Sequence, residues 1–130
     1  MSMTLSLNVL LAVAAGGALG AVSRFLIQHL MGLWFGMAFP WGTMVVNVLG
    51  CFCIGLLSGY WLSHDFALTM QLRAFMAIGF LGAFTTFSAF SLDTMLLFHN
   101  GEILRASLNV LGNLVLCLMA VVIGYALTSR

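Results

Sequence analysis

The sequence contains very few charged residues and no lysine. Charged residues make up 5% of the 130 positions, hydrophobic residues make up 63%, and the basic residues are four arginines. Soluble domains contain about 25% charged residues, so this composition excludes a water-exposed surface of ordinary size. A net charge of +1 on scattered arginines also excludes nucleic acid as a partner, because its binding needs clustered basic side chains. We expect an integral membrane protein with the lipid bilayer as its solvent.

Cysteine is scarce as well. The three cysteines, Cys51, Cys53 and Cys117, are odd in number and all lie in apolar runs. Cys51 and Cys53 would point to nearly opposite sides of a helix. No disulfide framework is indicated, and we expect three free, small packing residues.

The motifs of an enzyme are missing. There is no cluster of His, Cys and acidic residues with metal-ligand spacing, no phosphate-binding glycine loop followed by lysine, and no nucleophile with a base at a recognisable spacing. The histidines, His29, His64 and His99, lie near the ends of apolar runs, as interfacial residues do. We therefore expect no enzymatic activity.

Four long apolar runs dominate what is present. A membrane-spanning helix needs about 20 apolar residues, so four spans with short loops fill the chain and leave no room for a soluble domain. The N-terminus lacks the positive flank of a signal peptide, and we expect the first span to be retained. We predict a single all-α integral membrane domain over 1–130, with spans at about 7–30, 41–62, 73–98 and 103–127 and a first loop over 32–40.

Two pairs of glycines are spaced four residues apart inside the spans. Gly16 and Gly20 lie in the first span, and Gly55 and Gly59 lie in the second. Small residues at this spacing form a face on which another helix can approach closely. We expect two such close-packing faces.

The third span is interrupted by polar residues. Residues 79–91 read GFLGAFTTFSAFS, a mixture of glycine and hydroxyl residues with phenylalanine. Backbone released from a helix at membrane depth is tolerated only where protein or a water-filled cavity satisfies its polar groups. The span is long enough to include an unwound turn near Gly82 to Thr86, and such breaks mark binding sites.

Neutral polar side chains also gather inside the spans: Thr43, Asn47, Ser88, Ser91, Asn109 and Asn113. Their amide and hydroxyl donors suit a small anion, because selectivity arises when wall groups replace the hydration shell. The positive ring edges of Phe87 and Phe90 can line the same path. Intramembrane asparagines also link helices by hydrogen bonds, so a tightly packed bundle without transport stays open.

Arg24 and Asp93 are charged residues placed deep in the spans. An arginine at such depth costs at least about 2.5 kcal/mol on insertion scales, so it must reach the interface or a partner. We expect both residues to be structural, and an anion-attracting role of Arg24 stays open as the alternative. Arg24 is expected to bind backbone carbonyls or Asp93, and Asp93 to meet an arginine or a polar track.

Positive charge is balanced between the two sides of the membrane. One side holds Arg73 and Arg130, and the other holds Arg105 and the end of the span that carries Arg24. The positive-inside rule then selects no orientation, and the chain can insert both ways. Four short helices do not easily enclose a path, and their glycine faces are available to a partner. We therefore expect an antiparallel, dual-topology homodimer.

Three motifs resemble those of the small bacterial fluoride channels called Fluc or CrcB. Residues 16–24, GGALGAVSR, resemble the family's glycine-rich first span that ends in arginine, and residues 42–50, GTMVVNVLG, resemble its G-T-x-x-x-N-x-x-G second span. Residues 79–91 resemble its G-F-x-G-G-x-T-T-F-S-T-F-S signature. The motifs occur in the family's order and cover nearly the whole chain.

The resemblance implies a channel that passively exports fluoride across the bacterial cytoplasmic (inner) membrane and confers fluoride resistance. It implies a dual-topology dimer with two pores, in which Phe87 and Phe90 are the paired rings of each pore and Asn47 lies near them. A structural sodium ion at the dimer centre would be held by the backbone carbonyls of Gly82 and Thr85 from both subunits. The implied polar track is completed by Thr43, Ser88, Ser91 and Asn113.

Four positions depart from the family pattern. Ala83, Phe84, Ala89 and Asp93 stand where the family has glycine, a smaller aliphatic residue, threonine and glutamate. These departures concern pore rate and sodium affinity, and they leave the two rings and Asn47 unchanged.

Two other interpretations compete with the channel. A small dual-topology proton-coupled exporter would need a glutamate in its first span, where this chain has no acid. A structural membrane protein would tolerate other apolar residues at Phe87 and Phe90 without loss of transport.

Overall fold

The protein is described by a computed structural model that covers residues 4–64 and 69–130. These residues form helices and contain no strand. Four helical segments are long and apolar enough to cross a membrane, so this is a multi-pass membrane protein. The expected all-α architecture with four spans is confirmed. The segments are α1 (Leu7–Phe35), α2 (Trp41–Ser63), a third segment over 70–99, and α6 (Ile103–Thr128).

The third segment consists of four pieces and contains the predicted break. It begins with α3 (Met70–Arg73) and continues into η1 (Ala74–Leu81), whose wide turns bond five residues back instead of four, and then into α4 (Gly82–Phe84). Thr85 and Thr86 leave the helix with extended backbone, at φ −83°, ψ 156° and φ −151°, ψ 116°. The helix resumes as α5 (Phe87–His99). The break is therefore confirmed, but Gly82 is still helical.

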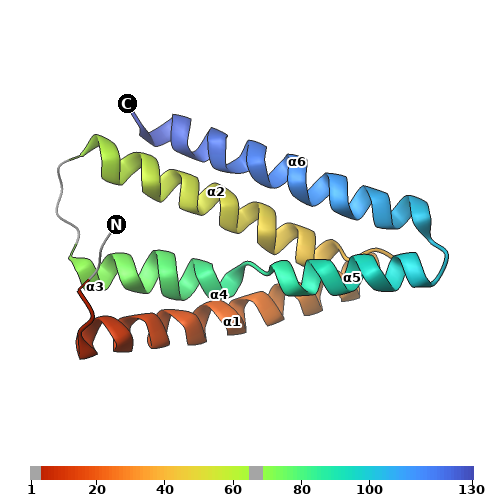
Figure 1. The fold of residues 1–130 in the computed structure, drawn as a ribbon, viewed down its shortest axis with the longest axis horizontal. Helices are drawn as coiled ribbons and strands as arrows, with labels where there is room; N and C mark the ends of the chain where they lie inside the picture. The colour runs from red at the N-terminus through yellow and green to blue at the C-terminus, as the bar shows by residue number, and fades with distance from the viewer. Residues whose placement is uncertain (1–3, 65–68) are drawn as a thin grey trace.

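The four spans form two closely packed pairs. α2 packs along α6, and α1 packs mainly along η1 and α4 (Figure 1). α1 and the third segment run in one direction, and α2 and α6 run in the other. The break between α4 and α5 lies near the middle of the third segment, and α2 lies between that segment and α6. Residues of α2, α5 and α6 are thereby brought to the break.

Gly16 and Gly20 bring α1 into backbone contact with η1. A Cβ atom at Gly16 would collide with the carbonyl oxygen of Phe75, and one at Gly20 would collide with that of Phe80. Only a residue without a side chain permits this approach. The close-packing face expected on the first span is confirmed.

Gly55 and Gly59 bring α2 into backbone contact with α6. A Cβ atom at Gly55 would meet the carbonyl oxygen of Val121, and one at Gly59 would lie 2.5 Å from that of Tyr125. Both expected glycine faces are therefore occupied within one chain. The expectation that they are available to a partner subunit is wrong, and a dimer needs other support.

The first span is longer than its hydropathy indicated. α1 continues past Leu30 to Phe35 and ends where Gly36 adopts φ 78°, a left-handed conformation that glycine accepts at low cost. The predicted loop over 32–40 is accordingly shorter. The third segment begins three residues before Arg73, because the Thr69 hydroxyl accepts the Leu72 N–H as an N-cap, 3.3 Å away.

Candidate polar pocket at the helix break

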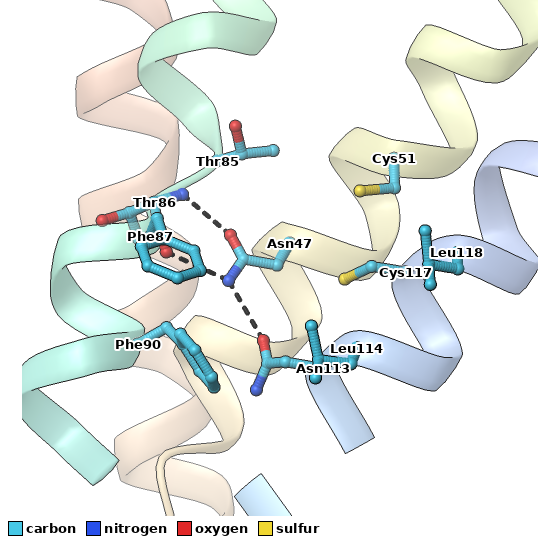
Figure 2. Close-up of a pocket in the computed structure, with 10 residues that line it drawn as sticks. All are labelled: Asn47, Cys51, Thr85, Thr86, Phe87, Phe90, Asn113, Leu114, Cys117 and Leu118. Carbon is cyan, nitrogen blue, oxygen red and sulfur yellow. Dashed lines mark hydrogen bonds between the residues drawn. The ribbon is translucent and has the colours of Figure 1, made fainter. Parts of the chain in front are cut away.

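A pocket of about 280 Å³ opens beside the break in the third segment. Three elements supply its walls: α2, the break with the start of α5, and α6 (Figure 2). Four of the residues predicted to line the fluoride pore, Asn47, Phe87, Phe90 and Asn113, are brought together here, with Thr85 of the predicted sodium site beside them. The full lining is Asn47, Cys51, Thr85, Thr86, Phe87, Phe90, Asn113, Leu114, Cys117 and Leu118.

The Asn47 side chain bonds to the backbone of Thr86 in both directions. Its Oδ1 accepts the Thr86 N–H at 2.8 Å, and its Nδ2 donates to the Thr86 carbonyl oxygen at 3.1 Å. Because a backbone N–H can only donate, the first bond fixes which end of the amide is oxygen. The amide thus replaces bonds that an unbroken helix would have made for Thr86 (Figure 2).

Asn47 also begins a network that crosses to α6. Its Nδ2 donates to Asn113 Oδ1 at 3.1 Å, and Asn113 Nδ2 donates to Asn109 Oδ1 at 3.0 Å. Asn109 Nδ2 then donates to Thr94 Oγ1 on α5 at 2.9 Å. Asn109 is fully buried, so its polar groups need these partners. The asparagines lock α2, α5 and α6 around the break.

Phe87 and Phe90 form a ring pair at the start of α5. Their centroids lie 5.3 Å apart with an angle of 54° between the ring planes, so the rings are tilted against one another and not stacked. Phe90 is 8% exposed, whereas Phe87 is 74% exposed. One ring is therefore held by its own chain, while the other projects from it.

Thr43 and Asp93 meet outside this pocket. The Thr43 hydroxyl donates to Asp93 Oδ2 at 2.8 Å and accepts from Gln28 Nε2 at 3.3 Å. Asp93 thus meets a polar side chain, one of the two partners expected for it. This triad of α1, α2 and α5 residues is separate from the network around Asn47.

Ser88 and Ser91 lie on the exposed side of α5 and do not line the pocket. Ser88 Oγ lies 3.2 Å from Thr86 Oγ1, and Ser91 Oγ donates to the carbonyl oxygen of Phe87 at 2.9 Å. Asn109 is also absent from the lining because it lies behind Asn113. The predicted polar residues therefore form several groups within one chain.

Arg24 binds the third segment one turn before the pocket. Its Nε donates to the Ala83 carbonyl oxygen at 3.0 Å. Of the two partners expected for it, the structure shows the backbone carbonyl, and the alternative pairing with Asp93 is wrong. The contact is possible because the break leaves carbonyl groups at the end of α4 without helical donors.

Gly82 and Thr85, the residues expected to bind sodium through their carbonyls, have both lost their helical donors. The Thr86 N–H, which would serve Gly82 in an unbroken helix, donates to Asn47. The Ala89 N–H, which would serve Thr85, donates to the Thr86 hydroxyl at 3.1 Å. Gly82 is also exposed. These two oxygens suit a hard cation such as sodium, whereas no cluster of His, Cys or acidic side chains for a metal occurs in the described residues.

The sequence profile of the family described as CrcB-like protein, Camphor Resistance (CrcB), matches residues 11–125. The match begins inside α1 and ends inside α6, so it includes part or all of each of the four spans. The chain belongs to the CrcB family.

CrcB relatives with the name fluoride-specific ion channel FluC are similar over most of the chain. The Methylococcus capsulatus protein is 49% identical over 121 residues, covering 93% of this chain and 53% of the relative, so this chain spans about half of that protein. The Shewanella baltica (strain OS185) protein is 49% identical over 93% of this chain and 96% of the relative. That of Shewanella sp. (strain ANA-3) is 48% identical with the same coverage. These names describe channels and not enzymes, in agreement with the missing enzyme motifs.

Within this CrcB chain, sequence reasoning missed the role of Thr86. Its backbone receives Asn47, and its hydroxyl caps α5. The signal was present, because a threonine directly before a helix is a favoured N-cap. Cys51 and Cys117 were expected only to pack, yet both line the pocket. No motif indicated that, since it depends on how α2 and α6 pair.

Proposed function

We propose that this protein is a fluoride-selective channel that lets fluoride leave the cell passively across the bacterial cytoplasmic membrane. Its membership of the CrcB family and the channel name of its relatives support this proposal. The structural observation that carries it is the Asn47 amide bonded to both backbone groups of Thr86. That contact holds open a helix break beside a polar pocket with two phenylalanine rings.

The pocket offers an anion two kinds of positive partner. Phe87 and Ser88 are the first residues of α5, so their N–H groups have no carbonyl acceptor within that helix. These N–H groups lie at the N-terminus of α5, which is the positive end of the helix dipole. The ring edges of Phe87 and Phe90 carry the positive part of the quadrupole. A narrow, partly apolar passage admits an ion only where groups of the wall replace the ion's hydration water. A passage of this kind favours the small fluoride ion over larger anions.

Asn47 acts by positioning in this proposal. Both N–H bonds of its amide are donated to protein oxygens, at Thr86 and Asn113. The amide therefore fixes the backbone at the break and keeps the start of α5 aimed at the pocket. Asn113 and Asn109 hold the same network from α6, and the hydroxyls of Thr43, Ser88 and Ser91 continue a polar track beyond it.

An antiparallel dual-topology homodimer with two pores completes the proposal. Phe87 is 74% exposed beside the buried Phe90, so a second subunit that covers Phe87 would close the open side of the pocket. The balance of two arginines on each side supports insertion in both orientations. Two pockets per dimer then give two pores.

The sodium ion is proposed on the carbonyl oxygens of Gly82 and Thr85 from both subunits. The diversion of their helical donors supports this assignment. The carbonyl end of α4 is the negative end of a helix, so cation and anion would use opposite ends of one break. When bound, the ion would neutralise these carbonyls at the dimer centre.

Fluoride efflux from liposomes tests the proposal. Wild type, Phe87→Ile, Phe90→Ile and the control Phe25→Ile, an exposed ring on α1, are compared with a fluoride electrode beside a parallel chloride measurement. We expect fast fluoride efflux, no chloride efflux, loss of most fluoride efflux in the two pocket variants, and no change in Phe25→Ile.

Either of two results would overturn this function. Absence of fluoride movement would favour a structural protein, and movement only under a proton gradient would favour an exporter. Equal efflux from wild type and both pocket variants would remove Phe87 and Phe90 from the pore.

A further inference from the structure

Cys51 and Cys117 face one another across α2 and α6, one helical turn from the asparagine pair. Asn47 Nδ2 and Asn113 Oδ1 are 3.1 Å apart, and the two helices run in the same direction. Each cysteine follows its asparagine by four residues, which returns it to the same face about 6 Å further along. The two cysteines therefore occupy matching positions on neighbouring helices, where both line the same pocket (Figure 2).

Both sulfur atoms are directed into the pocket. Cys51 and Cys117 line it together with Thr85, Phe87 and Leu118 (Figure 2). Both are free thiols of intermediate exposure. An ion bound between them would lie inside the cavity proposed for fluoride.

We propose that Cys51 and Cys117 form a two-sulfur site for a soft monovalent cation, Cu(I) or its probe Ag(I), and that its occupation blocks the pocket. Thiolate sulfur prefers soft cations over the hard ions of the cytoplasm. The metal site itself depends only on the two thiols, whereas the block depends on the proposed fluoride channel.

Charge balance favours one cation between one thiolate and one thiol. One S–H bond breaks, its proton leaves to water, the thiolate binds the cation, and the second sulfur donates a lone pair while keeping its proton. The resulting unit is neutral. A neutral product matters here because an uncompensated charge at membrane depth is expensive.

Cys53 provides a matched control. It lies two residues from Cys51 on the same helix and has intermediate exposure, but it lines a different, apolar pocket with Phe75 and Phe80. Replacing Cys53 leaves two thiols in the chain. The number of cations bound per chain then shows whether the two thiols share one cation or bind one each.

The experiment titrates Ag(I) into purified Cys53→Ser protein in chloride-free buffer, with free methionine present to compete with methionine side chains. Calorimetry gives the stoichiometry, and silver X-ray absorption gives the number of sulfur ligands. We expect one Ag(I) per chain with two sulfur ligands, and a single sulfur ligand in Cys51→Ser/Cys53→Ser and in Cys53→Ser/Cys117→Ser. Two Ag(I) per chain with one sulfur each would overturn the site.

Fluoride efflux with and without Ag(I) tests the block in the same preparations. We expect Ag(I) to abolish most efflux from Cys53→Ser liposomes and a thiol chelator to restore it. Each variant is compared with its own efflux before silver, and Ag(I) should leave the rate of Cys51→Ser/Cys117→Ser at its own starting value, whatever that value is. Unchanged efflux at full two-sulfur occupancy would overturn the block. Absence of efflux from wild-type and Cys53→Ser liposomes before silver is added would instead count against the channel. The number of sulfur ligands from X-ray absorption would still decide the metal site.

Discussion

Asn47 of α2 stands in for helical hydrogen bonds at Thr86 of the third segment. The amide accepts the Thr86 N–H at 2.8 Å and donates to the Thr86 carbonyl oxygen at 3.1 Å. Asn47 is 9% exposed and Thr86 is 8% exposed, so water has little access to these groups. A buried backbone group without a partner costs about 1–3 kcal/mol, and this single side chain satisfies two of them. The break persists because α2 supplies what the helix lost.

Replacing Asn47 by aspartate should separate its two bonds. Asn47→Asp keeps the acceptor for the Thr86 N–H but places a carboxylate against the Thr86 carbonyl oxygen and Asn113 Oδ1, both acceptors. We expect a loss of about 2–4 kcal/mol in stability and loss of fluoride efflux, because a buried negative charge is added whose second oxygen faces two acceptors. Thermal unfolding in detergent measures the first effect. Asn8→Asp, at an exposed position on α1, should unfold as wild type does.

Alanine at the glycines of α1 should distinguish close contacts from open space. Gly20→Ala places a methyl group on the carbonyl oxygen of Phe80, whereas the atom nearest to a methyl at Gly17 is 3.9 Å away. We expect Gly20→Ala to cost about 1–3 kcal/mol through overpacking. Gly17→Ala should be neutral or slightly stabilising, because alanine favours the helix. Equal melting temperatures for the two variants would contradict the packing of α1 on η1.

Arg24→Leu should destabilise the end of α4. The substitution removes the donor to the Ala83 carbonyl oxygen, and a charged hydrogen bond contributes about 1.5–3 kcal/mol. Arg105→Leu is the control, since its bond to Glu102 at 2.9 Å is a surface ion pair worth about 0–1 kcal/mol. Denaturant midpoints in detergent compare the two variants. A larger effect from Arg105→Leu would mean that Arg24 does not hold the third segment.

Removal of sodium should weaken the proposed dimer. With N-methylglucamine in place of sodium, the freed carbonyl oxygens of Gly82 and Thr85 from two subunits would face each other without a cation. We expect a lower melting temperature and slower fluoride efflux, both restored by sodium, because a ligand that binds only the assembled state stabilises it by mass action. Identical melting curves in the two buffers would argue against the site.

Composition and local pattern determined the solvent, the number of spans and the place of the break. Lipid demands long apolar helices with satisfied backbone, so 63% hydrophobic residues in four runs leave one architecture. The glycine pairs and the Thr-Thr-Phe-Ser stretch affect the helix in which they lie. Close-packing faces and a helix break can therefore be predicted from the sequence of that helix alone. The helix ends were less predictable, because each depends on the conformation of one residue: Gly36 ends α1, and Thr69 caps the start of α3.

Only the tertiary structure decided which polar groups meet. Asn47 and Thr86 are 39 residues apart, and Asn47 and Asn113 are 66 apart. Separations of this size extend beyond any single helix, so the residue pattern of one helix cannot predict these contacts. The pairing of α2 with α6, set by Gly55 and Gly59 against Val121 and Tyr125, fixes the register that places Asn47 beside Asn113 and Cys51 beside Cys117. The amide donors expected to face an ion are turned inward for the same physical reason, because a broken helix leaves backbone groups that the nearest buried amide must satisfy.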